Sequence, residues 1–266
     1  MPPAEPTVSE LFDLSGQVVL ITGAGGHLGS AMARALAEAG ASVIATSRDV
    51  DKAAAIAARL PSPTGAVHCG AALDHLDTDA LPERFGQIIE QAGKVDILVN
   101  NGHAADGHDW TSVTAEDFNR QLSNATGYFL LSRLFRDHVV VRQAPGSIVM
   151  LGSMYGVVAS YPDAYEGVCP ASPVAYHALK GGIIQMTRHL AAYWAADGVR
   201  VNCLSPGPFP SEKAPAGMVA RLEQKLPMKR MGQAHELKGA IVFLASRASS
   251  FMTGQNLIID GGWTAW

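Results

Sequence analysis

The sequence predicts an α/β domain: a doubly wound parallel sheet of about seven strands with helices on both faces. Short apolar runs alternate with longer amphipathic stretches along the chain, as buried parallel strands alternate with crossover helices. No repeat, linker or shift in composition divides the 266 residues, a length that suits one domain with a full core. We therefore expect a single domain over residues 13–266.

Each element is expected where the periodicity of the apolar residues changes. The expected strands are Val18–Ile21, Ser42–Ala45, Ala66–Cys69, Ile97–Val99, Ser147–Leu151, Arg200–Leu204 and Asn256–Ile259. The expected helices are Ser30–Ala39, Leu81–Ala92, Ala115–Val141, Pro173–Ala196 and Glu236–Ser246. Residues 1–12 are expected to form a flexible tail, because three of the first six residues are prolines.

Composition and charge exclude several classes of protein. Hydrophobic residues make up 48% and charged residues 17% of the chain, so it is globular and not disordered. The net charge of −4 gives no basic surface for nucleic acid, and no apolar run is long enough to span a membrane. The N-terminal residues lack the features of a secretory signal. The odd set Cys69, Cys169 and Cys203 has no metal-ligand spacing, so we expect free thiols in a cytoplasmic protein without a metal site.

The segment "TGAGGHLG" follows the first expected strand and precedes a helix. Gly23 suits a tight turn, Gly26 lets the backbone approach a phosphate, and Gly29 lets the helix pack against the strand. His27 and Leu28 lie between these positions, near the helix N-terminus that would face the anion. This turn predicts a Rossmann-type dinucleotide site with an altered glycine spacing, and Gly23, Gly26, His27, Leu28 and Gly29 are its expected cofactor-binding residues.

The end of the second strand bears on which dinucleotide binds. Binders of NAD often carry an acid here for the ribose diol, whereas this chain has Ser47 and Arg48. An arginine can pair with a 2′-phosphate in a bidentate manner. NADP is therefore favoured, and NAD remains open because Asp49 is adjacent.

The segment "YHALK" places Tyr176 and Lys180 four residues apart, on one face of a helix. A fixed ammonium, together with an oxidised nicotinamide, favours the phenolate and brings the tyrosine pKa closer to neutrality. Ser153 lies at the exit of an expected strand, where its hydroxyl could hold a substrate oxygen beside the phenol. Asn124 lies in the middle of an expected helix. Asparagine has a low helix propensity, so its presence there indicates a specific role.

These motifs together resemble the short-chain dehydrogenase/reductase family, from about Leu14 to the C-terminal "DGGW". The resemblance implies that Tyr176 is the general acid/base and that Ser153 orients the carbonyl or hydroxyl group. It further implies that Lys180 binds the nicotinamide ribose and lowers the pKa of the tyrosine, and that Asn124 holds a water of a proton relay. Additional cofactor contacts are implied at Asp74, Asn101, Pro206, Gly207, Phe209 and Ser211.

The segment between Ser153 and Tyr176 is longer than in the shorter members of the family. It resembles sugar-nucleotide epimerases and dehydratases, whereas the chain length and the C-terminal segment resemble simple oxidoreductases. Met154 and Tyr165 of this segment, with Ser153 and Tyr176, are the expected substrate contacts. His103 stands where the family has a small residue.

We therefore expect an NAD(P)-dependent oxidoreductase that interconverts a secondary alcohol and a ketone, with a sugar-derived or polyol substrate. One alternative is an epimerase or dehydratase that retains its nicotinamide, and another is a cofactor-sensing protein without catalysis. The resemblance also implies a homo-oligomer, a dimer or the homotetramer common in the family.

Overall fold

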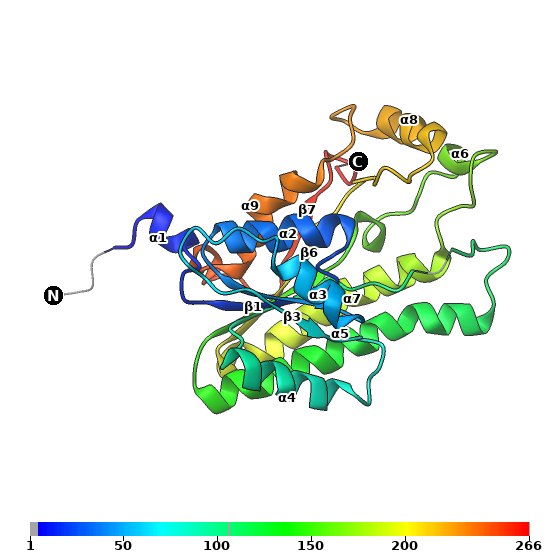
Figure 1. Cartoon of the computed structure of the whole chain (residues 1–266). Coiled ribbons are helices and arrows are strands. Elements are labelled where there is room, and N and C mark those ends of the chain that lie inside the picture. Colours follow the sequence, from blue (N-terminus) through cyan, green and yellow to red (C-terminus); the bar gives the residue numbers. More distant parts are fainter. Residues whose placement is uncertain (1–4, 106, 266) are drawn as a thin grey trace.

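The computed structural model of the protein describes residues 5–105 and 107–265 (Figure 1). Its centre is a seven-stranded parallel sheet in the order β3-β2-β1-β4-β5-β6-β7. The strands are β1 (Val18–Ile21), β2 (Ser42–Ser47), β3 (Cys69–Ala72), β4 (Ile97–Asn100), β5 (Gly146–Leu151), β6 (Val199–Pro206) and β7 (Asn256–Ile259). The predicted doubly wound α/β fold is confirmed.

The central strands are apolar because both of their faces are covered. Every residue of β1, β4 and β5 is buried. Their registers pair Leu20 with Ile44 on one side and with Leu98 on the other. Continuous runs of valine, leucine and isoleucine are typical of such strands.

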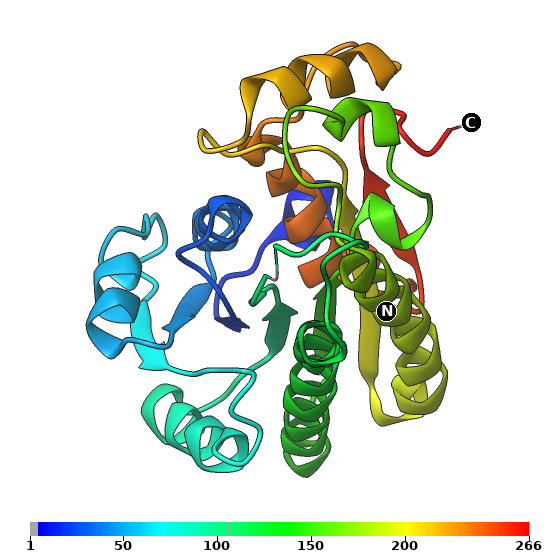
Figure 2. The same ribbon diagram turned by 90° about the vertical axis from the view of Figure 1, so that its right-hand side faces the viewer.

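Six helices cover the two faces of the sheet (Figure 2). One face packs against α2 (His27–Glu38), α3 (Val50–Ala57) and α9 (Lys238–Ala245), with Met32, Leu36 and Leu244 among the buried side chains. The other face packs against α4 (Leu81–Ala92), α5 (Ala115–Arg142) and α7 (Val174–Trp194), whose buried side chains include Phe85, Phe135 and Ile183. The sheet therefore has a separate apolar cluster on each side.

The remaining helices are short and lie at the edges of this frame. They are α1 (Val8–Phe12), α6 (Pro162–Tyr165), α8 (Ala216–Lys225) and the 3-10 turns η1 (Met154–Gly156), η2 (Ala195–Asp197), η3 (Ala234–Leu237) and η4 (Arg247–Ser249). The sequence analysis did not predict α1, α3, α6 or α8. Helix α1 lies within the segment expected to be flexible, and a capping box between Thr7 and Glu10 begins it.

The third strand begins three residues later than predicted. The backbone amide of Val43 in β2 donates to the His68 ring Nδ1 at 3.1 Å, so a side chain occupies the place of a strand partner. Val67 is 77% exposed. Strand pairing starts at Cys69, which pairs with Ile44 of β2. The next residue is Gly70, and a Cβ on it would lie only 2.2 Å from the Ala54 nitrogen of α3. The edge of the sheet therefore needs a glycine under α3.

The strand order reverses between β1 and β4, the place at which open α/β sheets form a crevice beyond their carboxyl ends. The β1 turn and the β4 loop meet there. Gly23 has φ +64°, and a Cβ on it would lie 2.8 Å from the Gly102 Cα. A side chain at this point would separate the two segments.

Gly29 packs the first turn of α2 directly onto this junction. A Cβ at position 29 would lie 2.2 Å from the Gly23 carbonyl oxygen and 2.6 Å from the Asn101 Nδ2. Gly29→Ala should therefore lower the free energy of unfolding by about 1–3 kcal/mol, measured by urea denaturation.

Gly86, in the middle of α4, provides the matched control. Nothing lies within 4 Å of a Cβ placed there. Gly86→Ala should raise the free energy of unfolding by about 1 kcal/mol, because alanine is the better helix former. A Gly29→Ala protein as stable as Gly86→Ala would contradict the close packing at the turn.

Candidate active site

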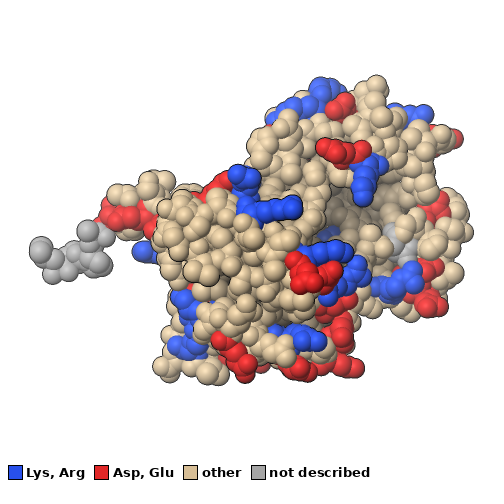
Figure 3. Space-filling view, viewed as in Figure 1, with Lys and Arg blue, Asp and Glu red and all other residues tan. Residues whose placement is uncertain are grey.

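Three connected cavities lie beyond the carboxyl ends of the strands. An outer pocket of about 570 Å³ runs from the β1 turn past the end of β2. An inner pocket of about 460 Å³ runs from the same turn to the start of α7. A side cavity of about 400 Å³ extends from the inner pocket beneath α8. Figure 3 shows the hollow that they form in the surface.

The β1 turn is held by hydrogen bonds from the β4 loop. The Asn101 Nδ2 donates to the carbonyl oxygens of Thr22 and Gly23 at 2.9 and 3.0 Å. The Thr22 Oγ1 accepts from the backbone amides of Asn101 and Gly102. Asn101, which the resemblance implied as a cofactor contact, thus joins the β4 loop to the β1 turn.

The turn leaves the N-terminus of α2 open toward the inner pocket. Gly26 is the N-cap of α2 and has no side chain to accept from the first backbone amides, so these amides suit an anion such as a pyrophosphate. Gly23, Gly26, His27, Leu28 and Gly29, the five residues predicted from the glycine pattern, all line this pocket. The residues present therefore fit a dinucleotide.

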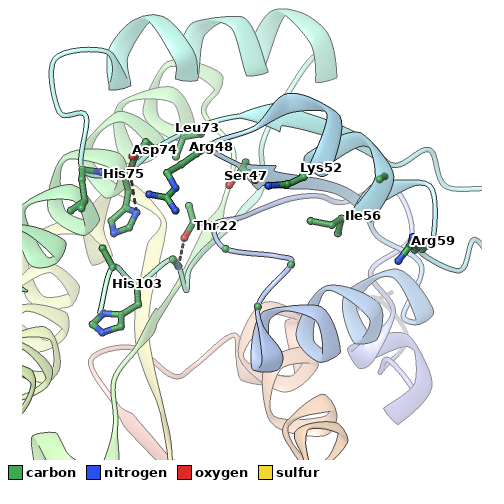
Figure 4. A pocket seen from close by; sticks show the side chains of 18 residues that line it. Thr22, Ser47, Arg48, Lys52, Ile56, Arg59, Leu73, Asp74, His75 and His103 are labelled. Atoms are coloured by element: carbon green, nitrogen blue, oxygen red, sulfur yellow. Dashed lines mark hydrogen bonds and ion pairs between the residues drawn. The ribbon is translucent and has the colours of Figure 1, made fainter. Parts of the chain in front are cut away.

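Ser47, Arg48 and Asp74, three of the residues predicted to contact the cofactor, line the outer pocket (Figure 4). The carboxylate of Asp49 instead caps α3, because its Oδ1 accepts from the backbone amides of Asp51 and Lys52. Those bonds, chiefly the one from Lys52, hold the pKa of Asp49 below its usual value. Asp49, the acidic residue that kept NAD open as a cofactor, is therefore engaged in capping α3.

The outer pocket has further lining residues that sequence reasoning missed. Lys52 and Arg59 of the α3 segment add two cations to the lining. In Figure 4, Lys52 lies between Arg48 and Arg59, and Arg59 is at the far end of the pocket from Arg48. His75 follows Asp74 and is buried. The amphipathic pattern of α3 would have revealed Lys52, whereas no spacing rule indicates His75.

Ser153, Tyr176 and Lys180 line the inner pocket together. The Lys180 Nζ donates to the Leu151 carbonyl oxygen at 2.7 Å and lies 5.6 Å from the centre of the Tyr176 ring. Lys180 is buried, and this burial lowers its pKa to about 8. The hydrogen bond ties α7 to the end of β5, two residues before Ser153.

The pKa of Tyr176 differs from the expectation for this residue. Burial raises it above its usual value, and the neighbouring Ser153 hydroxyl lowers it in part. In this structure the tyrosine is a phenol, the form that donates a proton.

Asn124 is buried in α5 and links three segments. Its Oδ1 accepts from the Ala104 amide and from the His75 Nε2, both at 2.9 Å. Its Nδ2 donates to the carbonyl oxygens of Ala104 and Gln121. A side-chain amide has two donor hydrogens and two acceptor sites, and all four are used. The side chain therefore positions the β4 loop.

His103 lies where the three cavities meet. Its Nε2 accepts from the Gln121 side-chain amide at 3.2 Å, and its ring contacts Tyr176 edge-on at 5.4 Å. Surrounding protein atoms and the Lys180 ammonium lower its pKa to about 3. The ring is therefore neutral and carries its proton on Nδ1.

The other predicted residues divide into those in the cavities and one outside. Pro206, Gly207 and Phe209 line the inner pocket. Met154 and Tyr165 line the side cavity with Ser153 and Tyr176. Ser211 is exposed and lines none of the three cavities, so the structure does not bring it to the predicted cofactor site.

The described residues, 5–105 and 107–265, show neither a metal cluster nor a membrane-spanning helix. This part of the chain contains no cluster of three or more histidine, cysteine, aspartate or glutamate residues that could hold a metal ion. None of its helices is both long and apolar enough to cross a bilayer. Cys69, Cys169 and Cys203 carry free thiols.

Comparison with known proteins identifies the family. Residues 23–264 match a family model described as enoyl-(acyl carrier protein) reductase. Galactitol 2-dehydrogenase (L-tagatose-forming) of Cereibacter sphaeroides is 35% identical over 96% of this chain and 98% of its own length.

Two solved structures add information on cofactors. Gluconate 5-dehydrogenase from Burkholderia cenocepacia, in complex with NADP and tartrate, is 31% identical, with a TM-score of 0.88 over 98% of this chain and all of that one. A short-chain dehydrogenase from Leptospira borgpetersenii with bound NAD+ is 30% identical, with a TM-score of 0.84 over 98% of this chain and 97% of that one. Relatives thus bind either dinucleotide.

This chain belongs to the short-chain dehydrogenase/reductase family. It is an NAD(P)-dependent oxidoreductase that interconverts alcohol and ketone groups. The family and the general reaction predicted from the sequence are confirmed.

Burial of Lys180 leads to a pH-dependent difference in stability. Its pKa falls from 10.5 in the unfolded chain to about 8 in the folded chain, so the unfolded chain binds more protons between these values. The stability contributed at this site therefore rises with pH across that window. In urea unfolding without cofactor, the free energy of unfolding of the wild type relative to Lys180→Met should rise by up to about 2 kcal/mol from pH 7 to pH 9.5. A constant difference would contradict the lowered pKa.

Proposed function

We propose that this protein reduces a ketone, or oxidises the corresponding secondary alcohol, with NADP(H), and that Tyr176 is its proton donor and acceptor. The observation that carries this proposal is the convergence of Ser153, Tyr176 and Lys180 on the pocket that continues from the open N-terminus of α2. A bound nicotinamide supplies the hydride for the carbonyl carbon in reduction and accepts it in oxidation.

Tyr176 and Ser153 act on the oxygen of the substrate. In reduction the Tyr176 phenol gives its proton to the carbonyl oxygen as negative charge develops there, and the Ser153 hydroxyl donates a second hydrogen bond to the same atom. Burial keeps the phenol protonated before the reaction, as its raised pKa indicates. The carbonyl becomes a secondary alcohol, and the phenolate regains a proton from solvent.

Lys180 has two functions in this proposal. Its buried ammonium stabilises the transient phenolate, and it offers its remaining donors to the ribose of the cofactor. The bond to Leu151 fixes the Nζ while these donors act. Asn124 acts by positioning the β4 loop through Ala104.

The preference for NADP rests on charge at the outer pocket. Arg48, Lys52 and Arg59 supply three cations to the lining, and Ser47 supplies a hydroxyl. The Asp49 carboxylate, which could have bound a ribose diol, is held by α3. This combination suits a 2′-phosphate better than a free diol.

We also propose that the protein is a cytoplasmic homo-oligomer, a dimer or tetramer. Val141 of α5 is 84% exposed, and Tyr193 of α7 is 70% exposed. Large apolar side chains on neighbouring helices suit burial against a second copy. Sedimentation of the purified protein measures its mass, and a monomer would contradict the proposal.

Removing the phenol oxygen tests the role of Tyr176. Tyr176→Phe should reduce kcat by about 10²–10⁴-fold and leave NADPH binding within about twofold, because only the proton transfer is lost. Steady-state kinetics and a fluorescence titration of NADPH measure the two quantities. Tyr193→Phe makes the same change near the C-terminal end of α7, outside the lining of the three cavities, and should leave both unaltered. A Tyr176→Phe enzyme with near-normal turnover would contradict the role of Tyr176 as proton donor and acceptor.

Removing the Arg48 guanidinium tests the choice of cofactor. Arg48→Ala should weaken NADPH binding by about 10–100-fold, because charge-assisted hydrogen bonds to the phosphate are lost. NADH binding should change by less than about threefold. Arg84→Ala, on the surface of α4 and outside the lining of the outer pocket, is the control. Equal weakening of both cofactors would argue for a structural role of Arg48.

A further inference from the structure

We propose that the substrate carries an apolar substituent, which binds beneath α8, and that polyhydroxylated ketones and alcohols are poor substrates. This inference rests on the proposed function, since it names the class of ketone that Ser153 and Tyr176 act on. It departs from the polyol substrate expected from the sequence and from the names of the relatives.

The first observation is the chemistry of the side cavity, which opens beside Ser153 and Tyr176. Its walls are formed mainly by Met154, Phe209, Met218, Val219, Leu222 and Met231, together with three prolines. Its described lining contains no aspartate, glutamate, asparagine, glutamine, lysine or arginine. A polyol would therefore have only tyrosine, serine and histidine side chains and the backbone as partners here, although each hydroxyl that leaves water needs a hydrogen-bond partner.

The second observation is that the polar side chains of this cavity already have partners. The hydroxyls of Tyr155 and Tyr165 bond to each other at 2.7 Å. The Ser172 Oγ bonds with the His177 Nε2 at 3.1 Å. Ser153, Tyr176 and His103 lie at the end near the inner pocket, where the reacting oxygen binds. Polar recognition is thus concentrated at the reacting centre.

The orientation of α8 is the third observation. Arg221 donates to the carbonyl oxygens of Asp163 and Glu166, and Lys225 pairs with the Asp163 carboxylate. These charged residues fasten α8 to the α6 segment. Met218, Val219 and Leu222 of the same helix line the side cavity. The helix is amphipathic, and one apolar stretch of it faces the substrate.

Three of the wall residues are methionines, Met154, Met218 and Met231. Methionine side chains are unbranched and adapt to different shapes. The cavity should therefore accept a range of apolar groups, both linear and cyclic, rather than one fixed outline. Its volume of about 400 Å³ is within the range of sites for small molecules.

A series of ketones of matched size tests the inference. The enzyme is assayed with NADPH on methyl ketones from 2-butanone to 2-octanone, and on polyhydroxy ketones of equal carbon number such as tagatose and ribulose. Each added methylene should raise kcat/KM by about two- to fourfold until the cavity is filled. The polyhydroxy ketones should have kcat/KM at least about 10-fold below the apolar ketone of the same length.

Substitutions in the cavity wall locate the effect. Met218→Gln and Met231→Gln should flatten the dependence on chain length and lower kcat/KM for 2-octanone by about 10-fold, with little change for 2-butanone. Met228→Gln is the matched control, because Met228 lies in the same part of the chain, is 58% exposed and does not line the cavity. It should leave the series unchanged.

Calorimetry gives a readout that does not depend on turnover. The inactive Tyr176→Phe protein, loaded with NADPH, is titrated with the ketone series at several temperatures. Burial of apolar surface gives a negative heat-capacity change on binding, which should become larger with chain length. Met218→Gln should reduce that increase.

The outcomes separate the two proposals. Polyhydroxy ketones that react at least as well as apolar ones, through a Tyr176-dependent reaction, would overturn the inference and leave the proposed function standing. The same holds if kcat/KM and the heat-capacity change do not vary with chain length. If the protein binds NADPH but reduces no ketone of either series, the proposed function fails and the inference fails with it.

Discussion

The site depends on the close contact between the β1 turn and the β4 loop. Two glycines, Gly23 and Gly102, meet there without side chains, and Asn101 locks them through hydrogen bonds to Thr22 and Gly23. This contact lets α2 start at the mouth of the crevice with its amides open. A wider gap would displace the phosphate-binding turn from the pocket that contains Tyr176.

A second, smaller constraint aligns the reacting groups. The Lys180 ammonium is buried and therefore requires a partner, which it finds in the Leu151 carbonyl oxygen. Because Ser153 follows two residues later and Tyr176 lies one helical turn before Lys180, the same bond sets β5 and α7 in register. The buried ammonium of Lys180 thus aligns Ser153 with Tyr176, in addition to its proposed chemical role.

The apolar periodicity of the sequence was enough to predict the sheet and every covering helix except α3, and β1 and β7 have the predicted bounds. All but one of the residues predicted to contact the cofactor line the outer or inner pocket, and the exception, Ser211, lies outside the cavities. The errors came from tertiary contacts. The ring of His68 replaces a strand pair at β3, and Asp49 serves as a helix cap. The apolar wall beneath α8 joins segments far apart in the chain, so no local pattern could reveal it.

The attachment of α8 also shows what holds this helix over the cavity. Its ties to α6 include an ion pair in which the Asp163 side chain is 63% exposed, and such pairs contribute little to stability in water. The cover over the cavity is therefore held less by its charges than by apolar contacts, in which Leu222 and Leu226 pack with Ala164, Tyr165 and Trp263. These contacts are separate from the two apolar clusters that flank the sheet. In evolutionary terms, substrate choice can change in the cover while the catalytic frame stays the same.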